Sequence, residues 1–196
     1  MAIAAQLKKV VFLDRDGVIN RDSPDYIKNW NEFEFLPGSL EALRLLSQAG
    51  FHLIVITNQS MIGRGMVPLK LLEETHRKLK DAVAATGGDI FDIFFCPHRP
   101  DEACDCRKPS PDLIQQACRR YGIDPADSVM IGDSAKDVLC GRNAGCGTTI
   151  LVRTGNGIRA EKELADLKLR PDLVVADLLD AARYLLGRAG SPGDRR

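Results

Sequence analysis

The chain has 196 residues, of which 27 are basic and 27 acidic, so its formal net charge at pH 7 is zero. This balance gives no electrostatic reason to expect a nucleic acid or a membrane surface as a partner. No apolar run approaches the ~20 residues that span a bilayer, and the first lysines follow a short apolar stretch, the reverse of a signal peptide. We therefore expect a cytoplasmic protein with one domain at residues 1–187 and a disordered tail at 188–196.

Apolar runs that alternate with helical patterns predict the fold. The expected strands lie at residues 9–13, 51–56, 91–95, 128–132, 149–152 and 172–175. Between them, leucines at helical spacing follow Pro37, a second apolar stripe follows Pro68, and a third helix opens after Ser110 and stops at Gly122. This alternation predicts an α/β fold with a Rossmann-like, doubly wound parallel sheet.

The first expected strand ends in two carboxylates, Asp14 and Asp16, which are followed by Gly17. In open α/β sheets ligands bind beyond the carboxyl ends of the strands, so these acids would face a ligand. Taken alone, an Asp-x-Asp-Gly segment fits a surface turn equally well. Polar side chains recur, however, after the second and fourth strands, at Thr57, Asn58, Gln59, Ser60, Asp133 and Asp137.

A dense group of soft-metal ligands follows the third expected strand, at Cys96, His98, Cys104 and Cys106. Three thiolates and one imidazole match a closed tetrahedral Zn²⁺ site, which leaves no open position for a catalytic water. We expect this zinc to be structural and to hold the following Arg-Lys pair at 107–108 in one conformation. Fe²⁺ or Co²⁺ would suit the same ligands. The remaining three cysteines are expected to be small core thiols.

Four segments, taken in chain order, resemble the motifs of the haloacid dehalogenase superfamily of phosphohydrolases. They are D-x-D-G-V from Asp14, T-N from Thr57, R-K-P from Arg107 and G-D-x-x-x-D from Gly132. The resemblance covers residues 10–151, and the ordered set of four motifs is far more specific than any one of them. It implies a Rossmann-like fold, a phosphate monoester as substrate and a catalytic Mg²⁺ ion.

The resemblance also implies the roles of the acidic residues. Asp14 would attack phosphorus and form an aspartyl-phosphate, which splits one difficult step into two. Asp16 would first protonate the leaving oxygen and then deprotonate the attacking water. The carboxylate of Asp14, the backbone carbonyl of Asp16 and Asp133 would hold Mg²⁺, with Asp137 in support.

Other motif residues would bind the substrate. Thr57 and the amide of Asn58 would hydrogen-bond phosphoryl oxygens, and Lys108 would supply a fixed positive charge. Arg107 would either reach a second polar group of the substrate or neutralise the metal loop, whose three thiolates and Zn²⁺ sum to a negative charge. The expected substrate-binding residues are Asn20, Asp22, Asn58, Gln59, Ser60 and Arg107.

The motif spacing leaves no room for a large cap domain over the acids. We expect an open site, rimmed by residues 20–36, 59–66 and 96–107, that takes a polar, extended, phosphorylated small molecule. An open site formed by one chain favours a monomer.

The substrate is narrowed by three segments, D-R-D-G-V-I-N, T-N-Q-S-x-I-x-R-G and the metal loop. Together they are similar to the D-glycero-D-manno-heptose 1,7-bisphosphate 7-phosphatase family. Histidinol-phosphate phosphatases share the metal loop, the D-R-D-G start and T-N-Q, and the short gap between His98 and Cys104 favours that alternative. The loops at 20–22 and 60–65 favour the heptose substrate. Two other classes stay open, a phosphotransferase and a non-catalytic, zinc-stabilised binding domain.

Overall fold

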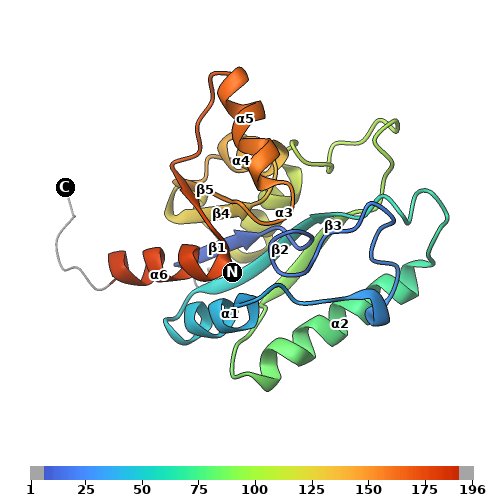
Figure 1. Ribbon diagram of the computed structural model, residues 1–196, viewed down its shortest axis with the longest axis horizontal. Coiled ribbons are helices and arrows are strands. Elements are labelled where there is room, and N and C mark those ends of the chain that lie inside the picture. Colours follow the sequence, from blue (N-terminus) through green and yellow to red (C-terminus); the bar gives the residue numbers. More distant parts are fainter. Residues whose placement is uncertain (1–6, 190–196) are drawn as a thin grey trace, which may run out of the picture.

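The computed structural model describes residues 7–189, and these residues form one six-stranded sheet (Figure 1). The strands are β1 Val10–Leu13, β2 His52–Asn58, β3 Asp92–Cys96, β4 Ser128–Gly132, β5 Thr148–Val152 and β6 Leu173–Val175. Their order across the sheet is β3-β2-β1-β4-β5-β6, and every neighbouring pair is parallel. The winding reverses direction between β1 and β4, which is where open α/β sheets bind ligands.

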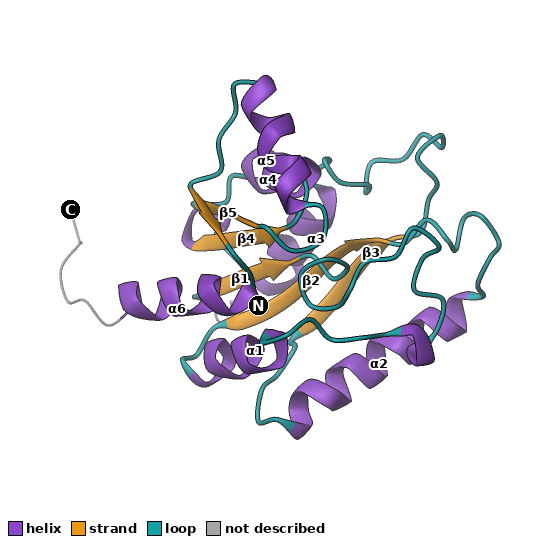
Figure 2. Ribbon diagram, in the orientation of Figure 1, coloured by secondary structure: helices purple, strands orange, loops and turns teal. Residues whose placement is uncertain are grey.

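Helices cover both faces of the sheet (Figure 2). The helices are α1 Ser39–Gln48, α2 Leu69–Ala85, α3 Asp112–Tyr121, α4 Ala135–Ala144, α5 Gly157–Asp166 and α6 Leu178–Ala189, with short 3-10 turns at Trp30–Glu32 and Pro125–Asp127. Helices α1, α2 and α6 lie on one face, and α3, α4 and α5 lie on the other. The predicted doubly wound sheet is confirmed, and residues 7–189 contain no large cap domain.

Strand β1 shows why both faces must be covered. Its alternate residues Val11 and Leu13 pack into the core beneath α1 and α6, whereas Val10 and Phe12 pack beneath α3. None of the four is more than 1% exposed. A strand that is apolar on both sides is stable only between two helical layers. The two carboxylates that follow therefore mark the point where β1 leaves the core.

Strand boundaries lie close to the predicted ones, with β2 extending two residues further, to Asn58. The tail expected at 188–196 begins inside α6, which ends at Ala189, and its remaining positions lie outside the described residues. Within residues 7–189, no helix has both the length and the apolar character needed to cross a membrane.

Two glycines allow the backbone to close tightly over the end of β1. Gly17 has a φ of +82°, and a Cβ atom at this position would lie 2.1 Å from Oδ2 of Asp133. Gly155, after β5, has a φ of +55°, and a Cβ there would lie 2.7 Å from the Cα of Gly17. The hydroxyl of Thr154 donates to the carbonyl of Gly17 at 2.6 Å. The β1 and β5 loops are thus packed backbone to backbone.

We predict that Gly17→Ala destabilises the protein more than Gly50→Ala. Gly50 has nearly the same φ, +81°, but a Cβ there meets nothing within 4 Å. Both changes carry the cost of about 1–2 kcal/mol for a left-handed residue, and only Gly17→Ala adds overpacking of about 1–3 kcal/mol. Urea unfolding of the two variants measures the difference, and equal losses would contradict the close approach seen at Gly17.

Candidate active site

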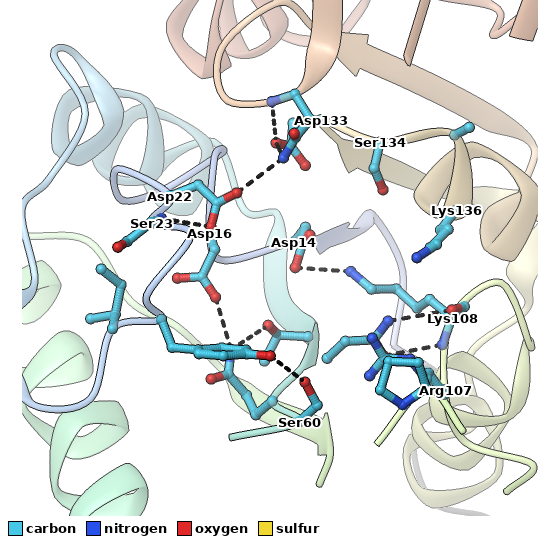
Figure 3. A pocket seen from close by; sticks show the side chains of 18 of the residues that line it. Asp14, Asp16, Asp22, Ser23, Ser60, Arg107, Lys108, Asp133, Ser134 and Lys136 are labelled. Atoms are coloured by element: carbon cyan, nitrogen blue, oxygen red, sulfur yellow. Dashed lines mark hydrogen bonds and ion pairs between the residues drawn. The ribbon is translucent and has the colours of Figure 1, made fainter. Parts of the chain in front are cut away.

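Polar side chains from several strand ends meet around one pocket of 310 Å³ at the β1/β4 edge (Figure 3). Asp14 and Asp16 follow β1, Thr57 is the second-last residue of β2, and Asp133 follows β4. Lys108 reaches the same pocket from the loop before α3. The parallel strands thus bring together residues that are far apart in the sequence, and the four segments that resemble the superfamily motifs converge.

The ammonium of Lys108 joins three of these segments. Its Nζ lies 2.8 Å from Oδ1 of Asp14, 2.6 Å from Oδ1 of Asp137 and 2.8 Å from the carbonyl oxygen of Ile56. The residue is only 3% exposed. Burial by itself lowers the pKa of a lysine, but the charges of Asp137 and Asp14 outweigh it here and raise the pKa of Lys108. The lysine is therefore charged, and its three N–H groups are all engaged.

Three carboxylates crowd around this lysine. Asp14, Asp133 and Asp137 each offer an oxygen within 4.8 Å of the other two. Burial and the charges of Asp137 and Asp133 raise the pKa of Asp14, although Lys108 opposes the shift. Burial and the charge of Asp137 raise the pKa of Asp133 to about 7, although the hydrogen bond from the backbone N–H of Asn156 opposes this shift. Three acids and one lysine leave excess negative charge, and a hard cation with oxygen ligands would relieve it.

The three acids are not equally available to a cation. Oδ2 of Asp137 accepts hydrogen bonds from the backbone N–H of Ser134, at 3.0 Å, and from its hydroxyl, at 2.6 Å. Its other oxygen contacts Lys108. Both oxygens of Asp137 are thus occupied within the protein, which leaves Asp14 and Asp133 as the carboxylates best placed to hold a metal ion.

Asp16 has a different environment from Asp14, although only one residue separates them. Nε of Arg15 donates to Oδ1 of Asp16 at 3.1 Å, and NH2 of Arg15 donates to Oδ1 at 2.7 Å and to Oδ2 at 2.9 Å. Asn20 donates to Oδ1 at 2.8 Å, and Gln59 donates to Oδ2 at 2.9 Å. Burial favours a higher pKa for Asp16, but the Arg15 charge and these hydrogen bonds outweigh it and lower the pKa.

Asn20 was expected to contact the substrate, and the structure places it elsewhere. Its side chain is fully buried and is absent from the pocket wall. Its amide nitrogen donates to Asp16 and, at 2.9 Å, to the carbonyl of Arg21. The physical reason is that Asp16 needs donors for its buried oxygen, and the turn after β1 folds Asn20 back beneath it. Asn20 therefore supports Asp16.

The residues at the end of β2 and directly after it line the pocket. Gln59 donates to the hydroxyl oxygen of Thr57 at 2.9 Å. The side chain of Asn58 forms a reciprocal pair with the backbone of Lys108, accepting from its N–H at 3.1 Å and donating to its carbonyl at 3.3 Å. Ser60 donates to the hydroxyl of Tyr26 at 3.5 Å. Asn58 thus fixes the lysine loop, while its neighbours face the pocket.

Asp22 and Arg107 lie on the pocket wall. Asp22 accepts from the side chain of Asn156 at 3.0 Å, and this contact connects the loop after β1 with the start of α5. NH1 of Arg107 donates to the carbonyl oxygen of His98 at 3.2 Å. Arg107 is therefore anchored to the backbone of the Cys/His loop while it borders the pocket.

The Cys/His loop has the dimensions of a tetrahedral metal site. The sulfurs of Cys96 and Cys104 lie 3.8 Å apart, and Nδ1 of His98 lies 3.6 Å from Cys96 Sγ and 3.3 Å from Cys106 Sγ. Zinc bond lengths of about 2.3 Å to sulfur and 2.0–2.1 Å to nitrogen give tetrahedral edges of roughly 3.8 Å and 3.5 Å. The four side chains are arranged as one ion would hold them.

One wall of the pocket is formed by residues that were not predicted from the motifs. Asn156 donates its backbone N–H to Oδ2 of Asp133 at 2.7 Å, and Arg159 donates to the side-chain oxygen of Asn156 at 3.0 Å. Lys136 and Tyr26 also border the pocket. A signal for Asn156 was present, because it lies in a Thr-Gly-Asn-Gly segment directly after a strand, at the same sheet edge as the other site residues.

His76, in α2, is buried, with its ring against Phe95. It also has a polar contact, since its Nε2 lies 3.3 Å from NH1 of Arg15. Burial, followed by the charge of Arg15, lowers the pKa of His76 to about 3, although Asp16 opposes the shift. The imidazole is therefore neutral near pH 7.

The sheet order, the acids at its switch point and the four converging motif segments are those expected of a haloacid dehalogenase-type hydrolase, and the comparisons place the chain in that class. A family model described as HAD-hydrolase-like matches residues 105–181.

Individual relatives identify the family within this class. A D-glycero-beta-D-manno-heptose-1,7-bisphosphate 7-phosphatase from Pseudomonas aeruginosa is 46% identical over 152 residues, which are 78% of this chain and 85% of that protein. The corresponding protein of Bordetella bronchiseptica is 42% identical over 182 residues, or 92% and 99% of the two chains. A crystal structure of the B. bronchiseptica phosphatase, complexed with magnesium and phosphate, matches with a TM-score of 0.85 at 41% identity and covers 92% of this chain and 99% of that chain. The chain belongs to the D-glycero-D-manno-heptose 1,7-bisphosphate 7-phosphatase family, as its motifs predicted.

The neutral state of His76 predicts a pH dependence of stability. In the unfolded chain a histidine titrates near pH 6.5, whereas the pKa of folded His76 is about 3. Between these values the unfolded state binds a proton that the folded state does not. The free energy of unfolding therefore falls with falling pH, by up to about 1.4 kcal/mol per unit from this residue. In urea unfolding at pH 7.5, 6 and 5, the wild type should lose more stability with falling pH than His76→Gln does. Parallel dependences of stability on pH in the two proteins would contradict this.

Proposed function

We propose that this chain is a Mg²⁺-dependent phosphatase that removes the 7-phosphate of D-glycero-β-D-manno-heptose 1,7-bisphosphate. The observation that carries the proposal is the contact of Lys108 with Asp14 and Asp137, beside Asp133, at the pocket. This arrangement supplies a nucleophile, a fixed positive charge and a set of hard metal ligands in one place. The heptose substrate is supported by the names of the relatives.

The metal ligands proposed for this chain are the Asp14 carboxylate, the Asp16 backbone carbonyl and Asp133. Asp137 supports them through Lys108 and does not bind directly, because both of its oxygens already have partners in the protein. Bound Mg²⁺ supplies the positive charge that lets a carboxylate approach a phosphate dianion. A relative at 41% identity is complexed with magnesium and phosphate, which supports this choice of metal.

The chemical steps follow from the chain's own side chains. Asp14 attacks phosphorus and becomes an aspartyl-phosphate, while Lys108 fixes the position of its carboxylate. Asp16 protonates the leaving oxygen. Its pKa is low in the free protein, but a phosphate dianion beside it disfavours a second negative charge and raises that pKa. After the alcohol leaves, Asp16 takes a proton from the water that hydrolyses the intermediate.

Substrate recognition is assigned to the residues on the pocket wall. Thr57 and the backbone amide of Asn58 donate to phosphoryl oxygens. Asp22, Gln59 and Ser60 are polar groups suited to sugar hydroxyls. Arg107 is the proposed contact for a second anionic group, since its planar fork of donors matches phosphate.

The Cys/His loop is proposed to hold a structural Zn²⁺ ion through Cys96, His98, Cys104 and Cys106. The near-tetrahedral distances among these ligands support the proposal. With all four positions filled by protein, the ion would act only by fixing the loop that leads to Lys108. The six unpaired thiols suit a reducing compartment, and we propose that the protein acts in the cytoplasm as a monomer, with its pocket formed by one chain.

We predict Mg²⁺-dependent phosphate release from the heptose bisphosphate in preference to histidinol phosphate. Asp14→Asn removes the nucleophile with little change of shape and should lower kcat by about 10³-fold or more. Asp81→Asn is the matched control, because this exposed aspartate of α2 pairs with Arg77 away from the pocket. Both substrates are assayed side by side with all three proteins, and the two heptose anomers are compared.

The outcomes of this assay separate the alternatives. Preference for histidinol phosphate would leave the chemistry intact and overturn the heptose assignment. Phosphate release only after addition of an acceptor alcohol would indicate a phosphotransferase. The absence of any release would favour a non-catalytic binding domain, and near-normal activity of Asp14→Asn would exclude the proposed nucleophile.

For the zinc loop, we predict that Cys104→Ser lowers the melting temperature, abolishes stoichiometric zinc binding and reduces kcat by about 10-fold or more. The reduction is indirect, because the loop positions Lys108. Cys118→Ser is the control, since this partly buried thiol of α3 packs against the core and is not among the metal ligands. Metal content is measured together with activity. Full activity after complete removal of zinc would show that the loop does not act through a metal.

A further inference from the structure

The guanidinium of Arg15 is fully buried, although arginine is rarely buried without compensating partners. Its Nε and NH2 groups are used by Asp16, at 2.7–3.1 Å. The ring of Phe33 lies 5.9 Å from its central carbon. The remaining nitrogen, NH1, contacts Nε2 of His76 at 3.3 Å. Asp16 and His76 thus hold the guanidinium from two sides.

The chemistry of the pair fixes the direction of this hydrogen bond. An arginine has donors only, so Nε2 of His76 must be the acceptor. The imidazole is then neutral and carries its proton on Nδ1. Its low pKa agrees with this state. His76 therefore presents a lone pair, and no positive charge, to the guanidinium.

The position of His76 is set by the hydrophobic core. It lies in the middle of α2, on the buried face that also carries Leu72, Leu79 and Val83. Its ring meets Phe95 of β3 edge to face, with centroids 5.7 Å apart. His76 does not line the pocket. A helix outside the pocket thus supplies a fixed acceptor to the turn that carries the two acids.

The group that gains from this acceptor is Asp16. Its side chain is 21% exposed, so one part faces the pocket while the rest receives donors from behind. Three of its five hydrogen bonds come from Arg15. If the guanidinium turned, the Asp16 carboxylate would lose three of its five hydrogen bonds and would no longer be held in its orientation toward the pocket. A misplacement of about 1 Å can cost 10²-fold in rate.

We propose that His76 is a positioning residue for phosphate ester cleavage: its acceptor nitrogen orients Arg15, and Arg15 holds the Asp16 carboxylate toward the leaving oxygen. The inference rests on the proposed phosphatase function, in which Asp16 protonates that oxygen. It assigns a part in the reaction to a residue that touches neither substrate nor metal. A histidine that only filled the core would be replaceable by an apolar side chain without an effect on the chemistry.

The test compares His76→Leu, which removes the acceptor, with His76→Gln, whose side-chain oxygen replaces Nε2. Val83→Ala is the control for weakened packing of α2, because this residue is fully buried on the same helix face and is not in contact with the site. Each protein is assayed with the preferred sugar phosphate and with p-nitrophenyl phosphate. The aryl phosphate has a leaving group that departs without a proton, so it does not need the general acid.

We expect His76→Leu to lower kcat/KM for the sugar phosphate by about 10-fold or more, and for p-nitrophenyl phosphate by less than about 3-fold. His76→Gln should recover most of the lost activity. Val83→Ala should lower the melting temperature but keep the ratio of the two kcat/KM values. Since kcat/KM reports the steps up to phosphoryl transfer, this ratio isolates the protonation of the leaving group.

Equal losses on both substrates, no loss in His76→Leu, or no recovery in His76→Gln would each refute the role of His76. The same change of ratio in Val83→Ala would show that it arises from loosened packing, and would refute it too. A wild-type protein that releases no phosphate from either substrate would instead refute the proposed function itself. The two failures are thus distinguished by the wild-type rates alone.

Discussion

The ammonium of Lys108 is the contact on which the organisation of the site depends. It joins Asp14 at the end of β1, the carbonyl of Ile56 in β2 and Asp137 in α4. These segments belong to the central strands and to the helix that follows β4, so one buried charge fixes their relative positions. Removing one partner of a buried ion pair leaves an uncompensated charge, which is strongly destabilising. The contacts of Lys108 thus fix the position of the Asp14 carboxylate and also link the ends of β1 and β2 to α4.

The two aspartates after β1 show how one turn provides two chemical environments. Asp14 lies among carboxylates and is matched by one lysine, and its pKa is raised. Asp16 accepts hydrogen bonds from Arg15, Asn20 and Gln59, and its pKa is lowered. Both carboxylates border the same pocket, and Gly17, with its positive φ, turns the chain directly after them. The local environment of each carboxylate, more than its residue type, therefore determines which chemical role it can take.

Much of this organisation could be predicted from the sequence, because it depends on short-range patterns. The strands are apolar on both faces, and their ends carry polar residues, so the meeting of Asp14, Thr57 and Asp133 followed from the rule for parallel sheets. The burial of Asn20 did not follow, since nothing local shows that a turn folds its amide beneath Asp16. The contact between Arg15 and His76 also escaped prediction. It joins residues 61 positions apart, and a histidine in an apolar helical stripe has the pattern of an ordinary core residue.

The arrangement of the Cys/His loop bears on how such pockets diversify. Its ligands lie at both ends of the stretch 99–103, and Arg107 is tied to the carbonyl of His98. With the proposed metal ion holding the ligands together, residues inserted between His98 and Cys104 would lengthen the outer rim and leave the ends of the loop in place. The lysine two positions after the last ligand then keeps its register with the nucleophile. The proposed metal site would therefore allow the length of the pocket entrance to vary while the reaction centre keeps its position at the end of the sheet.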